Sequence, residues 1–262
     1  MKVYIVTDLE GVSGVIGAPA SGQPGNQIVN PEVAARLLVG EVNAAVEGAL
    51  RGGATEVAVL DGHGGSRWIP IEDLHPEAYL IQGVPGPVSP FETERYEAVF
   101  QIGAHAMMGT PNAFLHHTFN SHAIVNMWLN GEKIGEIGIV SLLAGYYDMP
   151  VVLVSGDRAA CEEAEAFLGR VETVVTKIGL SRYRAKNRPP HKVRAELREK
   201  AEFALHHLTE FQPRKIPPPY ELRIQYMCPN TVEEAVRRGA KRIDAQTVAY
   251  EGQDFIEVWS KR

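Results

Sequence analysis

Two kinds of segment alternate along the first sixty residues. Residues 2–7 are a run of β-branched and aromatic residues that predicts a buried strand. Residues 31–51 place apolar side chains three and four apart, with Asn30 as a possible cap and a glycine pair at the end, which predicts a helix. Residues 55–60 predict the next strand. This order predicts a βαβ unit with parallel strands.

The alternation continues through the middle of the chain. Residues 97–102 and 149–157 predict two more strands, and Asp157 is placed to cap a helix after the second. We therefore expect an α/β fold, a three-layer domain with a mostly parallel sheet, over residues 1–191.

The pattern changes near residue 192. A charged amphipathic helix over about 192–209 leads into a proline-rich segment, which is followed by short strand-like and helical runs. We expect residues 192–262 to form a smaller C-terminal α+β subdomain.

The composition excludes several classes of protein. Of 262 residues, 45% are hydrophobic and 22% charged, which is typical of a globular fold. The net charge of -6, with no basic block, argues against a nucleic-acid partner. The apolar runs are too short to span a bilayer, and the first residues lack the pattern of a secretory leader, so we expect a cytoplasmic protein with no membrane partner. Cys161 and Cys228 lie far apart and predict neither a disulfide framework nor a sulfur-rich metal site.

Three of the predicted strands end on residue types that bind metals. Asp8 and Glu10 follow the first strand, Asp61 and His63 the second, and His105 the third. Because ligands of open α/β sheets bind outside the carboxyl ends of the strands, we expect these side chains to converge. A mixture of carboxylates and imidazoles suits Zn²⁺, and more than four candidate ligands allow two ions. Asp61 is equally consistent with a carboxylate that orients a histidine.

The segment after the third strand adds further candidates. His116, His117 and His122 lie in a predicted loop, where a histidine beside a metal suits acid–base or nucleophilic catalysis. Farther along, Glu132 lies beside a predicted turn, whereas Glu136 lies between a glycine and an apolar run. Glu136 is therefore the better candidate for a functional acid.

Six ordered motifs carry a resemblance to a known family: "TDLEGVSG", "DGHGGS", "LHPEA", "GAHAMMGTPNAFLHH", "NGEKIGEIG" and "LAGYYDMPVVLVSGD". Together they resemble the dinuclear-zinc D-aminopeptidases, and the similarity is dense over residues 1–185. The resemblance implies a catalytic histidine at His116, treated in the family as the nucleophile, and His117 is the alternative because the family pattern has one histidine here. It implies that Asp8 bridges two zinc ions. The implied zinc ligands are Asp8, Glu10, His63, His105 and Glu136.

The resemblance also implies a function. The chain is expected to be a metallo-aminopeptidase that hydrolyses short peptides with N-terminal D-amino acids such as D-alanine, using two zinc ions per subunit. A homo-oligomer is expected, by resemblance a decamer. Residue types alone leave two alternatives, a metal-dependent phosphoester hydrolase and a non-catalytic metal-binding or peptide-binding module. The first lacks the second aspartate and the threonine that would be expected around "DLEG" in aspartyl-phosphate hydrolases.

Overall fold

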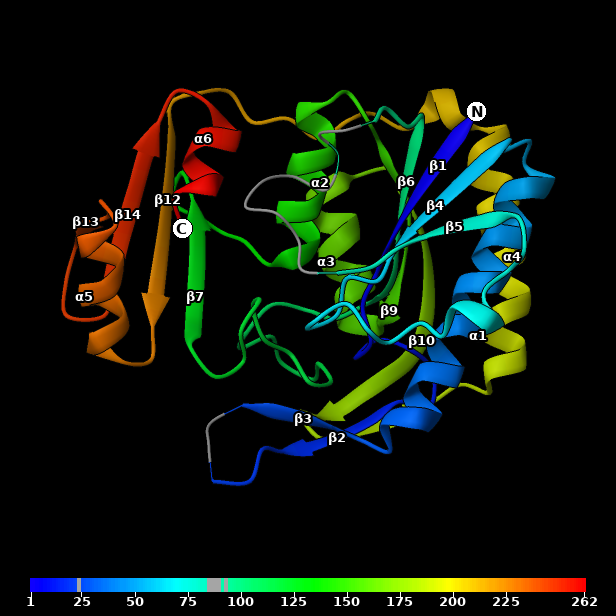
Figure 1. Cartoon of the computed structure of the whole chain (residues 1–262), viewed down its shortest axis with the longest axis horizontal. Helices are drawn as coiled ribbons and strands as arrows, with labels where there is room; N and C mark the ends of the chain where they lie inside the picture. Colours follow the sequence, from blue (N-terminus) through cyan, green and yellow to red (C-terminus); the bar gives the residue numbers. More distant parts are fainter. Residues whose placement is uncertain (23–24, 84–90, 92–93) are drawn as a thin grey trace.

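A seven-stranded sheet forms the centre of the protein (Figure 1). The structure is a computed structural model that describes residues 1–22, 25–83, 91 and 94–262. Neighbouring strands of this sheet are parallel, except for the antiparallel pair of β10 and β11 at one edge. This mostly parallel sheet confirms the expected α/β fold. In spatial order the strands are β11 (Arg184–Asn187), β10 (Glu172–Ser181), β9 (Val151–Asp157), β6 (Ala98–Ala104), β1 (Lys2–Thr7), β4 (Glu56–Leu60) and β5 (Ala78–Ile81).

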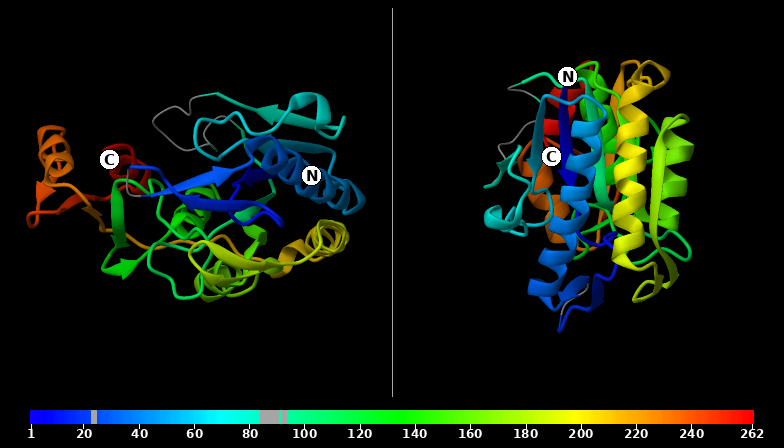
Figure 2. Two further views of the ribbon diagram at one scale, coloured as in Figure 1. Left: turned by 90° about the horizontal axis from the view of Figure 1, so that it is seen from below. Right: turned by 90° about the vertical axis from the view of Figure 1, so that its right-hand side faces the viewer.

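Helices cover both faces of this sheet. Helices α1 (Pro31–Arg51) and α4 (Pro190–His206) lie side by side on one face, as Figure 2 shows, and α2 (Glu136–Tyr146) and α3 (Arg158–Leu168) lie on the other. The bounds of α1 agree with the prediction, but Asn30 makes no side-chain cap and adopts a left-handed φ of 54°. Asp157 does cap α3, because its side chain accepts a hydrogen bond from the Ala160 N–H. No helix in the described part of the chain is long and apolar enough to cross a bilayer.

A second, antiparallel sheet lies beyond α2 (Figure 1). Its central strand, β12, pairs with β14 on one side and with β7 on the other. Helix α6 packs against β12 and β14. In spatial order the sheet comprises β13 (Lys241–Arg242), β14 (Thr247–Gly252), β12 (Tyr220–Tyr226), β7 (Ile124–Leu129) and β8 (Glu132–Lys133), accompanied by α5 (Pro229–Arg237) and α6 (Phe255–Ser260).

The expected division between residues 191 and 192 does not follow these layers. It falls inside α4, whose apolar side packs against α1 and the large sheet. The second sheet also takes β7 and β8 from the middle of the chain. Thus the C-terminal strands complete a sheet that an earlier segment begins. The smaller elements are the β2 (Ile16–Pro19) and β3 (Asn26–Val29) hairpin and the 3-10 turns η1 (Ile71–Asp73) and η2 (Leu208–Glu210).

The strand order brings the predicted ligand-bearing ends together. Strand β1 lies between β4 and β6, and the chain reverses its direction of travel across the sheet there, which is where open α/β sheets form a binding crevice. The segments that leave β1 and β6 approach very closely, since the Gly11 N–H donates to the Gly103 carbonyl oxygen at 2.8 Å. Gly103 has a φ of +79°, and a Cβ there would lie 2.2 Å from the Asp8 carbonyl oxygen. This approach requires glycine.

Candidate active site

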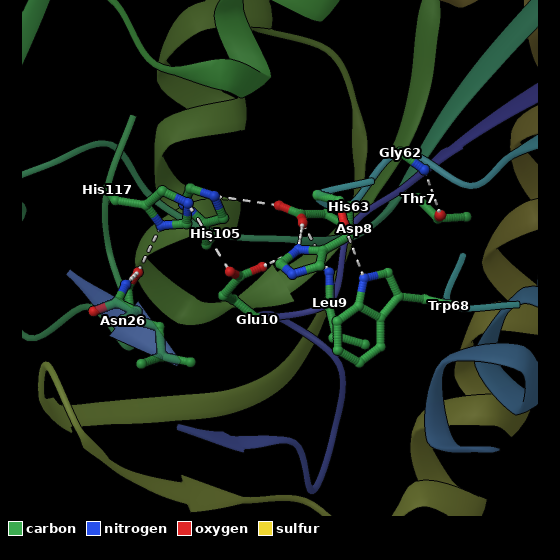
Figure 3. A network of polar contacts seen from close by, with 12 residues as sticks. Thr7, Asp8, Leu9, Glu10, Asn26, Gly62, His63, Trp68, His105 and His117 are labelled. Carbon is green, nitrogen blue, oxygen red and sulfur yellow. Dashed lines mark hydrogen bonds and ion pairs between the residues drawn. The ribbon is translucent and has the colours of Figure 1, made fainter. Parts of the chain in front are cut away.

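Asp8 lies at the centre of a cluster of carboxylates and imidazoles (Figure 3). Its Oδ1 is 2.9 Å from His63 Nδ1, and its Oδ2 is 3.2 Å from His105 Nε2. Glu10 Oε2 approaches His63 Nδ1 at 3.1 Å, and Glu136 Oε1 approaches His105 Nε2 at 3.1 Å. The structure therefore brings together all five side chains that the sequence predicted as ligands.

The cluster divides into two groups of ligand atoms. Asp8, Glu10 and His63 form one group, and His105, His117 and Glu136 form the other, each with its ligand atoms within 4.8 Å of one another. Asp8 contacts the second group through the carboxylate oxygen that it does not use toward His63. This arrangement suits a carboxylate that serves two cations.

The pKa values in the cluster reflect crowded carboxylates. Burial, with the neighbouring Glu10, raises the pKa of Asp8 to about 7. Burial lowers the pKa of His63, but the carboxylates of Glu10 and Asp8 outweigh it and raise the value to about 11. For His105 the Glu136 and Asp8 carboxylates likewise outweigh burial and raise its pKa well above the usual range. These shifts share one cause, the packing of several carboxylates around buried imidazoles.

The residues present fit zinc. Glu10 Oε2 and His105 Nε2 are buried and lack a hydrogen-bond partner among the described residues, although each lies within ion-pair distance of the cluster. His105 Nδ1 lies 3.0 Å from the Ala106 carbonyl oxygen, which can only accept, so Nδ1 carries the proton and Nε2 is the ligand atom. A donor set of carboxylate oxygens and imidazole nitrogens is the one that zinc favours over Mg²⁺ or Ca²⁺.

Asp61 holds the loop that carries His63. The side chain is fully buried, and its Oδ2 accepts hydrogen bonds from the Trp68 N–H at 2.6 Å, the Ile69 N–H at 2.9 Å and Gln82 Nε2 at 2.9 Å. It makes no contact with the ligand atoms among the described residues, so it supports the loop. The Trp68 ring meets His63 edge to face, with ring centroids 5.2 Å apart.

Glu136 is positioned by the first turn of α2. The helix begins directly after Gly135, so its N-terminal dipole stabilises a carboxylate at this position. Glu136 Oε1 also accepts a hydrogen bond from the Phe119 N–H at 2.6 Å. The histidine-bearing loop and α2 are therefore joined at this carboxylate.

The loop presents His117 to the cluster. The His117 ring is 8% exposed and stacks on His105 with centroids 3.9 Å apart. Its Nε2 lies 3.9 Å from both Glu10 Oε1 and Glu136 Oε1. Its Nδ1 lies 2.9 Å from the Leu115 carbonyl oxygen, so Nδ1 carries the proton and the Nε2 lone pair faces the carboxylates.

His116, the residue to which the family resemblance assigns the catalytic role, has a different set of neighbours. Its Nδ1 accepts a hydrogen bond from the Gly109 N–H at 3.0 Å, and it is not among the residues that line the cavity around the cluster. Leu115 adopts a left-handed φ of 49°, which redirects the chain just before the two histidines. In such an irregular segment neighbouring side chains point in different directions, and motif spacing could not decide which of them faces inward.

A cavity of about 1070 Å³ surrounds the cluster. Its apolar wall comes from β1, β4 and one face of α2, and further residues come from the C-terminal helix and the residues after it. Sequence reasoning missed this last contribution, because nothing in a short C-terminal helix signals that it will return to the site. The aromatic and cationic residues that it missed are Trp68, Phe119, Trp259 and Arg262.

Comparisons with known proteins agree with this geometry. The sequence model of the family Peptidase_M55, described as D-aminopeptidase, matches residues 1–261. A D-aminopeptidase of Bacillus subtilis (strain 168) is 31% identical over 263 residues, covering 99% of this chain and 94% of the relative. A similar solved structure is the Zn-dependent D-aminopeptidase DppA from Bacillus subtilis, described as a self-compartmentalizing protease. It has a TM-score of 0.90 and 30% identity, and the match covers 100% of this chain and 95% of that one.

Proposed function

The chain belongs to the Peptidase_M55 D-aminopeptidase family, and we propose that it is a zinc-dependent aminopeptidase that removes N-terminal D-amino acids, such as D-alanine, from short peptides. One observation carries this proposal. Two groups of ligand atoms lie at the meeting point of three parallel strands, inside a cavity large enough for a short peptide, and Asp8, a member of the first group, also contacts His105 of the second.

Two zinc ions per subunit are proposed for this cluster. Glu10 and His63 would hold one ion, His105 and Glu136 the other, and Asp8 would offer one oxygen to each. Zinc bound there would supply a Lewis acid for the scissile carbonyl and would lower the pKa of a water molecule. The protein fixes the ligands on strand ends and on the first turn of a helix, so the site is organised before the substrate binds.

His117 is proposed as the catalytic histidine in place of His116. Its Nε2 lone pair faces the cluster, and it lies farther from the carboxylates, at 3.9 Å, than the nitrogen atoms of His63 and His105 do. That position suits a group that takes a proton from an attacking water or gives one to the departing amine. The stack on His105 and the hydrogen bond to the Leu115 carbonyl oxygen hold the ring in this orientation.

The test compares metal-free and zinc-loaded protein on matched substrates. Dipeptides with N-terminal D-alanine and L-alanine, and a chromogenic phosphate ester, are assayed before chelation, after chelation and after zinc is restored. We expect the protein to hydrolyse the D-alanyl peptide. This activity should disappear when the chelator removes zinc and should return when zinc is added back. Full turnover by protein shown to hold no metal, or turnover of the phosphate ester alone, would contradict the proposal.

Assembly and location extend the proposal. The solved D-aminopeptidase that this chain resembles is self-compartmentalizing, which supports a homo-oligomer for this chain, with a decamer as the specific expectation. Light scattering coupled to size-exclusion chromatography measures the number of subunits directly. A cytoplasmic location is a prediction from the sequence.

A further inference from the structure

The cavity extends well beyond the metal-binding cluster. Glu136, Val140 and Leu143 lie on one face of α2 and all line it. Seven residue steps along the helix lead from the first to the last, a rise of about 10 Å. An extended dipeptide spans about 7 Å and a tripeptide about 10 Å, so the cavity accommodates a substrate whose two ends both contact the protein.

The charges of the cavity wall are unequally distributed. Asp8, Glu10, Asp61 and Glu136 all line the cavity, whereas Arg262 is the only lysine or arginine among the described residues that do so. A short peptide carries a positive amine at one end and a negative carboxylate at the other. Apart from the histidines, the Arg262 guanidinium is the cationic group that the described lining residues offer to that carboxylate.

Aromatic rings hold this guanidinium. The Arg262 Cζ lies 3.2 Å from the centroid of the Trp259 ring and 5.5 Å from that of Phe119. Arg262 Nη1 donates to the Trp259 carbonyl oxygen at 3.1 Å, which leaves other N–H groups of the guanidinium without a partner among the described residues. A guanidinium stacked on an aromatic face keeps its N–H edge available for a planar carboxylate.

Phe119 connects the guanidinium to the metal-binding cluster. Its N–H donates to Glu136 Oε1 at 2.6 Å, while its ring lies 5.2 Å from Trp259 and under the Arg262 guanidinium. One residue thus spans from a proposed zinc ligand to the aromatic rings that hold Arg262.

We propose that Arg262, stacked on Trp259 and Phe119, binds the free C-terminal carboxylate of the substrate. This inference rests on the proposed function and narrows its substrate class to short peptides with a free carboxyl end. A bidentate arginine–carboxylate pair is among the stronger charge-assisted contacts, and loss of either partner is expected to cost about 10- to 100-fold in binding. The substrate is then held by both ends, which disfavours longer chains.

The experiment compares D-Ala-Gly-Gly with its C-terminal amide, which differs only at the carboxylate. Both are assayed with the zinc-loaded full chain, and both are titrated calorimetrically into metal-free protein, which reports binding without turnover. The variants are Arg262→Met, Arg262→Lys and Lys261→Met. Lys261 is the matched control, because its ammonium pairs with Glu257 at 2.6 Å and it does not line the cavity.

We expect the unmodified protein to prefer the acid over the amide by about 10- to 100-fold in kcat/KM, mainly through KM. Arg262→Met should abolish the preference, because it should lower kcat/KM for the peptide acid and leave kcat/KM for the amide unchanged. Arg262→Lys should retain part of the preference. Lys261→Met should leave the preference unchanged. Equal use of both peptides by the unmodified protein, or a preference that survives Arg262→Met, would overturn the inference. If neither peptide is hydrolysed, the proposed function fails, and calorimetric discrimination between acid and amide still decides whether Arg262 binds the carboxylate.

Discussion

Replacing Lys177 with methionine should lower both the stability of the protein and the zinc affinity of the site. Lys177 is fully buried in β10, and its Nζ donates to the Glu10 carbonyl oxygen at 2.7 Å and to the Val15 carbonyl oxygen at 3.0 Å. The ammonium also lies 4.5 Å from the centroid of the Phe114 ring. The segment that follows β1 carries the proposed ligand Glu10. The Lys177 side chain fixes this segment at two points, Glu10 and Val15.

The expected cost follows from the two carbonyl groups. Methionine has a similar volume, so the substitution removes the donors without opening a large cavity. A buried carbonyl left without its donor costs about 1–3 kcal/mol, so two of them predict a loss of about 2–6 kcal/mol in the free energy of unfolding. Because the lysine supports a ligand through the backbone, zinc affinity should also fall by about 10- to 100-fold.

Denaturant unfolding of the metal-free protein measures the first quantity, and competition with a chromophoric chelator measures the second. Lys186→Met is the matched control, since Lys186 lies exposed on the neighbouring strand β11. It should change the free energy of unfolding by less than about 0.5 kcal/mol. A Lys177→Met protein with unchanged unfolding and unchanged zinc affinity would refute the role given to this lysine.

Three further outcomes are expected. His117→Ala should lower kcat by about 10²- to 10⁴-fold while His116→Ala stays near the parent value, and the reverse ranking in steady-state assays would restore His116 to the role. Gly103→Ala should destabilise the protein by at least about 2 kcal/mol in denaturant unfolding, because the new Cβ meets the Asp8 carbonyl oxygen, and unchanged stability would contradict the close approach. Burial lowers the pKa of His63, but the neighbouring carboxylates raise it to about 11. Its proton must leave when zinc binds, so zinc affinity should rise with pH, and calorimetry in buffers of different ionisation enthalpy should detect proton release.

The central strands and their ligands were predictable because their signals are local. A buried parallel strand is a short apolar run, and polar side chains directly after it must lie at the carboxyl end of the sheet. Asp8, His63 and His105 therefore could be placed before the strand order was known. The observed strand order, with β1 between β4 and β6, makes their convergence a consequence of topology.

The remainder depended on long-range packing. Strands β7 and β12 pair although about a hundred residues separate them along the chain, and hydrophobic periodicity carries no information about such partners. The choice between His116 and His117 depends on the left-handed backbone of Leu115, which non-glycine residues adopt infrequently. Arg262 reaches the cavity only because α6 packs on the second sheet. Each of these features is set by tertiary contacts that have no signature in the nearby sequence.

Anomalous diffraction at the zinc edge, from crystals of the zinc-loaded protein, tests the central claim most directly. Two peaks are predicted between the ends of β1, β4 and β6, one beside Glu10 and His63 and the other beside His105 and Glu136, with one Asp8 oxygen directed at each. A single peak, or peaks that Asp8 does not touch, would contradict the dinuclear site.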